Sequence, residues 1–345
     1  MAEDGKQSRR ATLVDVAKLA KVSPSAVSRT FTAGASVSKK TRLRVLKAAE
    51  ELGFRPNILA RSLMTGRSAL IGLVSNAFSN PYVMNIIDVF TTELQNRNLR
   101  PLVFNLTGKH DWVETVRLMS QYQIDGIVIA SSTLEPEFVA RVGKSKIPAV
   151  VAFGRSIGED GIDSVSVDNV EGGRIAAREF LRRGYGRLGF IGAPEFVTTS
   201  QDRHIGFRDQ LAADGKASPK VQHAQEYSHA AGFAAAVELL ERHPEIDGLF
   251  CADDLIGIGA LDALRTRLKR KVPDTGVIGF NDIQMAGWPS HSLSTLRTHT
   301  DQIVVSAIDM LQARIENGPR PKEKRIISCE MVVRDSLRPV TSSFS

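Results

Sequence analysis

The sequence of 345 residues lacks the features that would place it in a membrane, on a secretion pathway or among disulfide-stabilised proteins. No run approaches the roughly 20 apolar residues that a membrane-spanning helix needs. The first ten residues, MAEDGKQSRR, are polar and have no apolar core, unlike a secretory signal. Two cysteines, Cys251 and Cys329, are too few for a disulfide framework, and neither lies in a CxxC motif. We therefore expect a protein of the reducing cytoplasm.

Sequence motifs of enzymes and metal sites are also missing. No HExxH or GxSxG is present, and the seven histidines are scattered along the chain. His223 and His229 are six residues apart, a spacing more typical of ordinary surface histidines than of metal ligands. The run Gly257-Ile258-Gly259 lacks the third glycine of a dinucleotide-binding loop. We therefore expect no catalytic residue, no metal site and no cofactor.

The charge is distributed very unevenly between the two ends of the chain. Hydrophobic residues make up 42% and charged residues 24%, which is ordinary for a globular protein, and the length predicts two or three domains. Residues 1–68 hold fourteen Lys or Arg and five Asp or Glu, a balance of +9, whereas the remainder has a balance of −2. A run of charge is often only a solvated face. A compact basic module before a near-neutral body is also typical of nucleic-acid binding.

Three helix starts can be recognised in the basic segment. Thr12 is followed three residues later by Asp15, the pattern of a capping box. Ser23 precedes Pro24, which suits the first helical position because its missing N–H would have no partner there. Ser38 begins a third helix, which a glycine ends. Two short helices joined by a tight turn and braced by a third predict a helix-turn-helix, whose second helix enters the major groove of DNA.

Apolar residues at helical spacing define the core that we expect in this segment. They are Leu13, Val16, Ala17, Ala20, Val27, Phe31, Val45, Leu46, Ala49 and Leu52. We expect Ser25, Ser28 and Arg29 to face outward, and Arg29 has the reach for a guanine or a phosphate. A small three-helix bundle with an accidental basic face remains the alternative.

The body alternates buried strands with helices, in two successive series, which predicts two α/β lobes with parallel sheets. The expected strands are 69–75, 100–105, 124–131, 148–153 and 163–167, then 187–193, 221–227, 248–252 and 276–280. Ligands of such sheets bind beyond the carboxyl ends of the strands, so the cleft between the lobes is the expected site.

Several blocks of the sequence resemble the LacI/GalR family of bacterial transcription regulators. TLVDVAKLAKVSPSAVSRTF, VSKKTRLRVLKAAEELGFRPN and ARSL match its DNA-binding headpiece and hinge. SVSVDNVEGGRIAAREFLRRGYGRLGFIG, DRHIGFRDQL, GLFCADDLIGIGALDAL and VIGFNDIQMAGWP extend the resemblance over residues 11–335.

The resemblance implies an N-terminal all-α helix-turn-helix headpiece plus hinge helix, then two α/β lobes of periplasmic-binding-protein type. The implied domains are the headpiece at 1–54, the hinge helix and linker at 55–68, and an effector-binding and dimerisation domain at 69–345. The chain would cross between the lobes three times, the last two near Leu293–Thr298 and Lys322–Ile326.

The resemblance also implies which residues contact double-stranded operator DNA. Pro24, Ser25 and Arg29 match base-reading positions, although Pro24 offers only apolar contact. Leu63 matches the hinge leucine that wedges into the minor groove, with Ala60 on the same face. Lys21 stands where many members have glycine in the turn. We expect phosphate contacts from Thr12, Ser23, Ser28, Lys39 and Asn57.

The matched effector positions are Asn76, Tyr82, Phe153, Arg203, Tyr227, Asp253 and Asn281. Arg203 is the strongest candidate for holding hydroxyls or a carboxylate, and Tyr227 for stacking on a sugar. Phe153 and Asn281 stand where several members have Asp, and Asp253 where Asn is frequent. Asp168 also matches, but we interpret it as a helix cap. These departures favour a polyol, sugar or sugar acid.

The sequence thus predicts a homodimeric transcription regulator, a repressor, whose affinity for operator DNA is controlled by a small-molecule effector, a sugar or sugar acid. It predicts no association with a membrane. The alternative is a solute-binding protein without DNA-regulatory activity, because the body alone would permit it.

Overall fold

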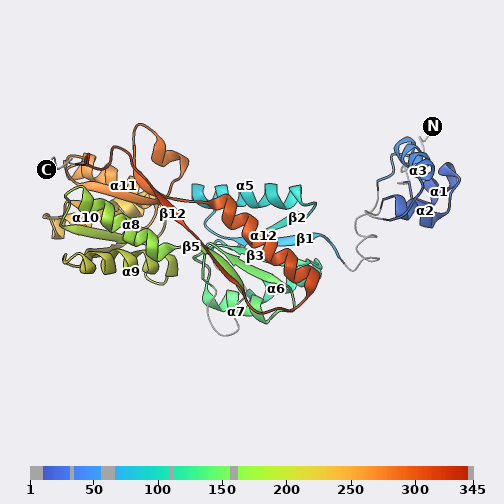
Figure 1. Cartoon of the computed structure of the whole chain (residues 1–345), viewed down its shortest axis with the longest axis horizontal. Coiled ribbons are helices and arrows are strands. Elements are labelled where there is room, and N and C mark those ends of the chain that lie inside the picture. The colour runs from blue at the N-terminus through green and yellow to red at the C-terminus, as the bar shows by residue number, and fades with distance from the viewer. Residues whose placement is uncertain (1–10, 32–34, 56–66, 109–111, 156–161, 341–345) are drawn as a thin grey trace, which may run out of the picture. The chain divides into compact units, whose positions relative to one another are not determined.

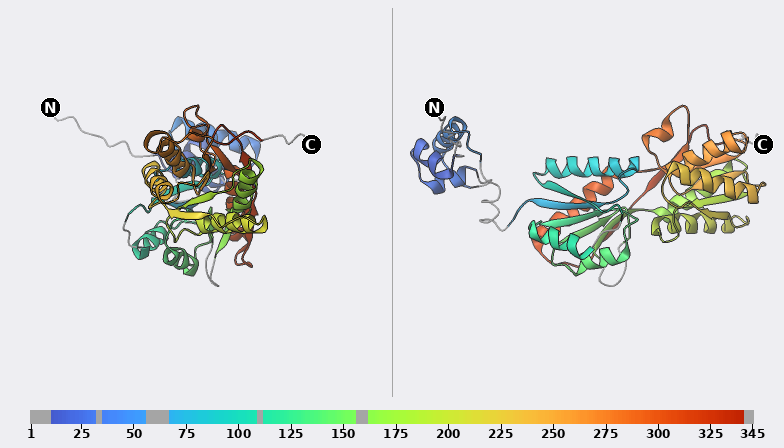
Figure 2. Two further views of the ribbon diagram at one scale, coloured as in Figure 1. Left: turned by 90° about the vertical axis from the view of Figure 1, so that its left-hand side faces the viewer. Right: turned by 180° about the vertical axis from the view of Figure 1, so that it is seen from behind.

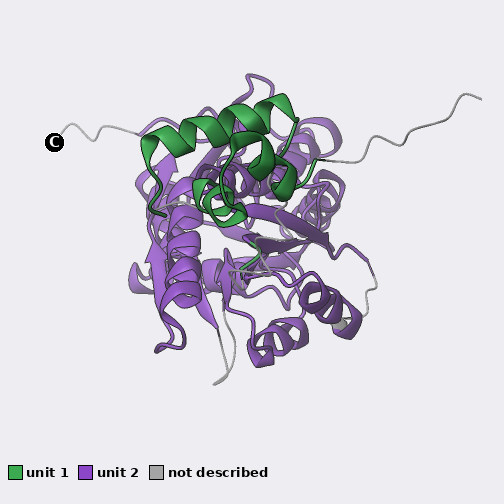
Figure 3. Cartoon of the chain, turned by 90° about the vertical axis from the view of Figure 1, so that its right-hand side faces the viewer, with its two compact units in different colours: residues 1–68 green, residues 69–345 purple. Residues whose placement is uncertain are grey.

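The computed structural model describes residues 11–31, 35–55, 67–108, 112–155 and 162–340. The chain divides into two compact units, residues 1–68 and 69–345, which are coloured separately in Figure 3. Within the described ranges, no helix is both long and apolar enough to span a bilayer.

The first unit holds the three expected helices, α1 (Leu13–Ala20), α2 (Pro24–Thr30) and α3 (Lys39–Glu51). The capping box is confirmed, since the Asp15 amide donates to Thr12 Oγ1 at 3.3 Å and Asp15 Oδ2 accepts from the Thr12 amide at 2.8 Å. Ser23 and Ser38 cap the other two helices. Lys21 ends α1 with a φ of 52°. This left-handed conformation costs a non-glycine residue about 1 kcal/mol of free energy.

The core of this unit differs from the expected one on α3. Val45, Ala48 and Ala49 are buried, but Leu46 is 44% exposed and Leu52 is 37% exposed, so their placement in the core was wrong. Val45, Ala48 and Ala49 lie three and four residues apart and form one helical face, from which Leu46 is rotated by about 100°. Leu52 lies beyond the last helical residue. The small alanines form this face of α3 against α1 and α2.

The second unit contains two six-stranded sheets. The first has the order β11-β5-β4-β3-β1-β2 and is parallel throughout. Its strands are β1 (Leu70–Ser75), β2 (Arg100–Asn105), β3 (Gly126–Ala130), β4 (Ala149–Ala152), β5 (Asp163–Val167) and β11 (Lys324–Ile327). The second has the order β12-β10-β9-β8-β6-β7, with only β10 and β12 antiparallel. Its strands are β6 (Leu188–Gly192), β7 (Lys220–His223), β8 (Gly248–Cys251), β9 (Gly276–Asn281), β10 (Ser294–Thr298) and β12 (Cys329–Val332).

Helices cover both faces of each sheet (Figures 1 and 2). We call the two halves lobe 1 and lobe 2. The helices of lobe 1 are α5 (Pro81–Asn96), α6 (Trp112–Gln121), α7 (Pro136–Lys144) and α12 (Thr300–Asn317). Those of lobe 2 are α8 (Asn169–Arg182), α9 (Thr198–Ala213), α10 (His229–Arg242), α11 (Asp254–Asp262) and the short η1 (Ala263–Arg267) and η2 (Gln284–Gly287). The predicted pair of α/β lobes is confirmed.

All nine predicted strands form, eight of them with ends within two residues of the expected ones. The strand expected at 221–227 stops at His223, because its last backbone bond to β6 runs from the Ala224 amide to Gly192 and the chain then turns away. Tyr227 therefore lies in a loop rather than at the end of a strand.

The chain crosses between the lobes three times, as expected. The crossings lie at Asp168, between β5 and α8, at His299, between β10 and α12, and at Ser328, between β11 and β12. The segments 293–298 and 322–326 expected to cross belong mainly to β10 and β11, and each crossing follows directly. The crossings lie a few residues later than expected for a physical reason. An extended segment beside a sheet forms backbone hydrogen bonds with the neighbouring strand before the chain leaves the sheet.

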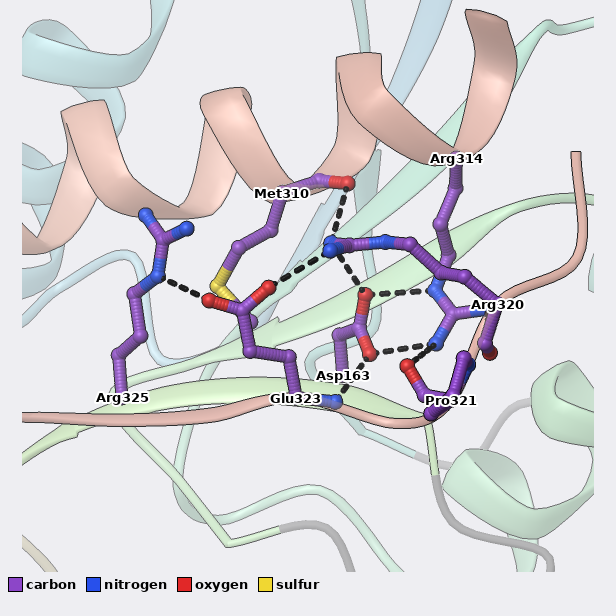
Figure 4. Close-up of polar contacts among 7 residues, drawn as sticks. All are labelled: Asp163, Met310, Arg314, Arg320, Pro321, Glu323 and Arg325. Atoms are coloured by element: carbon purple, nitrogen blue, oxygen red, sulfur yellow. Dashed lines mark hydrogen bonds and ion pairs between the residues drawn. The ribbon is translucent and has the colours of Figure 1, made fainter. Parts of the chain in front are cut away.

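A buried ion cluster fastens the end of α12 and the start of β11 to lobe 1 (Figure 4). Asp163 is fully buried at the start of β5, and both of its oxygens accept from Arg314 of α12 at 2.5 Å. Arg320 and the Glu323 amide also donate to Asp163, at 3.2 and 2.8 Å. Burial alone would raise the pKa of Asp163, but the hydrogen bonds from Arg314 and Glu323 outweigh it and lower the pKa.

We predict that Arg314→Met destabilises the protein by about 3 kcal/mol, because it removes the main partner of a buried carboxylate. The matched control is Arg117→Met, which removes an exposed ion pair with Glu114 and should cost much less, because exposed pairs contribute little to stability. Urea unfolding at pH 7 measures both losses. Since the lowered pKa of Asp163 stabilises the folded state above the unfolded pKa, the difference between the variants should shrink as the pH falls below about 4. Equal losses at pH 7 would contradict the assignment.

Candidate DNA-binding surface and effector cavity

The second helix of the headpiece presents its predicted base-reading residues to solvent. Pro24, Ser25 and Arg29 are exposed, and Ser28 is half-buried beside them. On the opposite side of α2, Thr30 is buried and its hydroxyl donates to the Ala26 carbonyl at 2.9 Å. Within the described residues Arg29 forms no ion pair, so its guanidinium is available to an external anion or base edge.

The residues expected to touch phosphates lie at helix starts. The hydroxyl of Thr12 donates to Asp15 at 2.6 Å and that of Ser23 lies 2.9 Å from Ser25 Oγ, so both side chains already serve their caps. Lys39 is exposed at the first position of α3. Helix starts also offer unpaired backbone N–H groups to anions. Asn57, Ala60 and Leu63 lie outside the described residues.

All seven predicted effector positions line one cavity between the lobes. It encloses about 610 Å³ of space, part of it open to solvent. Lobe 1 contributes Asn76, Tyr82 and Phe153, and lobe 2 contributes Arg203, Tyr227, Asp253 and Asn281. Polar wall residues that the sequence reasoning missed are Asn80, Ser131, Ser132, Thr133 and Asn169. Each of these lies within a few residues after the end of a parallel strand, which is the signal that could have found them.

Arg203 is a buried cation without a carboxylate partner among the described residues. Its side chain is held on three sides: Nε donates to Asn169 Oδ1 at 2.8 Å, Nη1 donates to the Ala252 carbonyl, and the guanidinium lies 3.5 Å from the centroid of the Phe280 ring. Arg203 is only 6% exposed. None of the described ion pairs includes it, so the remaining nitrogen is left for a ligand in the cavity.

Two glycines bring Arg203 to its partner Asn169. Gly173 of α8 and Gly206 of α9 pack the two helices so closely that a Cβ would lie 2.1 Å from the Arg203 carbonyl or 1.8 Å from that of Val170. Any larger residue would push α8 and α9 apart. Asp168 caps α8 by accepting from the Glu171 amide at 2.9 Å, which confirms the predicted structural role.

Asp253 and Asn281 form an acceptor-rich corner of the same wall. Asn281 Nδ2 donates to Asp253 Oδ2 at 2.8 Å, and the other oxygen of Asp253 caps α11 through the Leu255 amide at 2.7 Å. Asn281 has a φ of 111°, which strains a non-glycine residue. Its Oδ1 is buried and accepts no hydrogen bond from any described residue. A donor such as a ligand hydroxyl would satisfy this oxygen.

Burial also perturbs the acid groups of this wall. It is the main reason why the pKa of Asp253 is raised to about 6, an effect that the Leu255 amide and Arg203 oppose. The neighbouring Asp254 is completely buried, and burial together with the charge of Asp253 raises its pKa to about 7. Asp254 accepts from the Thr295 hydroxyl at 2.5 Å and the Ile283 amide at 2.8 Å, so it is a structural group.

Aromatic rings and amides complete the cavity. The rings of Tyr82 and Phe153 meet edge to face at 6.0 Å, and the Tyr82 hydroxyl lies 2.9 Å from Thr298 Oγ1 at the second crossing. Burial raises the pKa of both Tyr82 and Tyr227, so each phenol stays neutral. Asn76 Oδ1 accepts from Ser131 at 2.7 Å and from Thr133 at 3.0 Å, which fixes the amide of Asn76.

A helix-turn-helix unit joined to a two-lobed body with a polar cavity defines the class of DNA-binding proteins that respond to a small molecule. Residues 12–57 match the model of the bacterial regulatory proteins of the lacI family. Residues 68–329 match the model of the periplasmic binding proteins and sugar-binding domain of the LacI family. The chain belongs to the LacI family of transcription regulators.

Individual relatives agree with this assignment. The transcriptional regulator CelR of Thermobifida fusca is 29% identical over 339 residues, which are 95% of this chain and 98% of CelR. A solved structure of a CelR–cellobiose complex matches with a TM-score of 0.69 at 26% identity, over 95% of this chain and all of that one. The lac repressor dimer bound to its operator matches with a TM-score of 0.85 at 20% identity, over 96% and 100% of the two chains, and shows the fold alone.

We predict that the protein loses a few kcal/mol of stability as the pH rises from about 4 to about 7. The raised pKa values of Asp253 and Asp254 mean that the folded protein holds protons that the unfolded chain has released, so stability falls with pH in this window. Asp254→Asn should flatten the dependence, because it removes one of the two carboxyls whose pKa is raised. Urea unfolding at half-unit pH steps measures the slopes. An identical slope in the wild type and in Asp254→Asn would refute the prediction.

Proposed function

We propose that this protein is a cytoplasmic homodimeric repressor whose affinity for operator DNA is set by a sugar or sugar acid bound between its lobes. The observation that carries the proposal is Arg203, a buried cation with no carboxylate partner among the described residues, in the wall of a polar cavity. The match of residues 12–57 to the DNA-binding family model favours this function over that of a solute-binding protein.

The proposed DNA contacts divide by their role. Pro24, Ser25 and Arg29 read base edges in each half-site, Pro24 through apolar contact alone. Leu63, with Ala60 beside it, wedges into the minor groove at the centre of the operator. The phosphate contacts that set the register come from Thr12, Ser23, Ser28, Lys39 and Asn57. The hinge helix and linker at 55–68 join this reading head, residues 1–54, to the effector-binding and dimerisation domain, 69–345.

The proposed effector is a polyhydroxylated ring. Its hydroxyls donate to Asp253 and to the unpartnered Asn281 Oδ1, and its oxygens or carboxylate accept from Arg203. Tyr227 and Phe153 supply apolar surface for the ring, and Asn76 and Tyr82 supply polar contacts from lobe 1. The binding of cellobiose by CelR supports a sugar as the effector class.

The two binding events are coupled in both directions. The effector contacts both lobes, so it favours one arrangement of the lobes and thereby one geometry of the paired headpieces. Because coupling free energies are reciprocal, operator DNA changes the affinity for the effector by the same factor.

The DNA-binding function is tested by selecting genomic DNA fragments with the purified full-length protein at physiological salt. Wild-type protein should enrich near-palindromic sites, because a twofold dimer reads two half-sites. Arg29→Ala should weaken binding to the best site by about 1–3 kcal/mol and relax the preference at one base of each half-site. Footprinting and titration measure both effects. No enriched site for the wild type would overturn the function, and unchanged binding by Arg29→Ala would remove that residue from base reading.

Arg203→Ala should leave DNA binding intact and abolish the response to the effector, since the headpiece is a separate unit. The measurement is release or retention of the selected DNA fragment in the presence of pooled monosaccharides, disaccharides and sugar acids. Asp309→Asn, at an exposed residue of α12, is the control that should respond like wild type. A full response from Arg203→Ala would exclude the residue from the effector site.

A further inference from the structure

An ion pair joins the two lobes beside the effector cavity. Arg155 follows β4 in lobe 1, and Asp202 lies on α9 in lobe 2. Arg155 Nε donates to Asp202 Oδ2 at 2.8 Å, and Arg155 Nη2 donates to the other oxygen of the same carboxylate. The contact is therefore bidentate, the geometry that orients a guanidinium and a carboxylate most strictly.

This pair is unusual in its position. The other ion pairs found among the described residues all lie within a single lobe, as Arg97 with Asp309 does between α5 and α12. Arg155 comes two residues after Phe153, and Asp202 directly precedes Arg203, and both of these neighbours line the cavity. The ion pair thus ties the wall that carries Phe153 to the helix that presents Arg203.

The exposure of the pair suits a contact that must form and break. The Arg155 side chain is 41% exposed and that of Asp202 is 15% exposed, so both groups remain accessible to water when they separate. A fully buried pair would resist separation, because an unpaired charge would be left inside the protein. A partly exposed bidentate pair changes an equilibrium only modestly and responds to salt.

We propose that Arg155 and Asp202 form the latch of the effector cavity, a contact made when the lobes are closed and broken when they open. The proposal rests on the proposed function, in which the effector lies between the lobes. The latch sets the balance between the open and closed forms, and through it the affinity for the effector. Arg155 and Asp202 are positioning residues: they hold the walls together and do not touch the ligand.

The latch is tested by following lobe closure directly, without an effector or an operator. Cysteines introduced at Glu137 on α7 and Ala213 on α9, both exposed, carry a donor and an acceptor dye in full-length protein, while the native Cys251 and Cys329 are buried. Excess unlabelled protein suppresses energy transfer between protomers. Single-molecule energy transfer then reports the ratio of closed to open forms in the wild type and in each variant.

We expect Asp202→Asn and Arg155→Gln each to lower the closed-to-open ratio by roughly two- to fivefold. The double reversal Arg155→Asp with Asp202→Arg should restore most of the ratio, and high salt should lower the wild-type ratio. The control Asp309→Asn removes an ion pair of the same type, that of Asp309 with Arg97, but this pair lies within lobe 1. It should leave the closed-to-open ratio unchanged. Far-ultraviolet circular dichroism verifies that each variant is folded.

The possible results separate the latch from the function on which it rests. Unchanged ratios in both single variants would overturn the latch, even if the protein responds to sugars. Reduced ratios without restoration in the double reversal would also overturn it, because the pairing would not be the cause. Reduced ratios with restoration would support the latch, and would do so even if no sugar altered DNA binding, a result that would count against the proposed function alone.

Discussion

The burial of the Arg203 charge without a carboxylate partner is the constraint on which the design of the effector cavity depends. Moving an ion out of water costs several kcal/mol unless other groups replace the lost hydration. Here the replacement is partial: Asn169 and the Ala252 carbonyl accept from two nitrogens, and the Phe280 ring faces the guanidinium. The guanidinium of Arg203 is therefore held in place while one of its nitrogens still lacks an acceptor. A ligand that supplies this acceptor binds more tightly, because the protein has already fixed the orientation of the guanidinium.

That orientation has its origin in packing between helices rather than in the cavity itself. Gly173 and Gly206 let α8 and α9 touch through their backbones, and Asp168 fixes the first turn of α8. In lobe 1 the cluster around Asp163 performs a comparable task, because it fastens α12 and β11, the two elements between the second and third crossings. These contacts each hold elements within one lobe, whereas the Arg155–Asp202 pair lies between the lobes. Rigid bodies joined at a few points convert ligand contacts into a change of angle.

The sequence predicted those features that are governed by local chemistry. The caps at Thr12, Ser23 and Asp168 were correct because each needs only a side-chain oxygen within three residues of a free amide. The alternation of strands and helices was correct because buried parallel strands are apolar throughout. The resemblance to a known family selected the seven effector positions that line the cavity.

Features that depend on distant parts of the chain were missed. Leu46 was placed in the core because apolar character alone does not say which face of a helix its neighbours cover. Asn169 was overlooked because its role is to accept a hydrogen bond from Arg203, 34 residues further along the chain. That hydrogen bond forms only because two glycines let α8 and α9 pack closely. The Arg155–Asp202 pair spans 47 residues and two lobes, so no spacing rule indicates it. The wall of the cavity was predictable at each strand end, whereas the hydrogen bonds that orient it were not.

The distribution of charge determines how an effector can act on such a protein. Residues 1–68 carry a balance of +9, which supplies affinity for phosphates of any sequence, and that affinity depends on salt. A sugar adds no charge and a sugar acid adds one, so neither changes the electrostatic attraction substantially. Control must therefore come through geometry, by favouring or disfavouring the arrangement in which two headpieces meet two half-sites together. An effector that binds both arrangements equally would shift nothing however tightly it bound, so the contacts that differ between open and closed lobes, rather than the total number of contacts, decide the response.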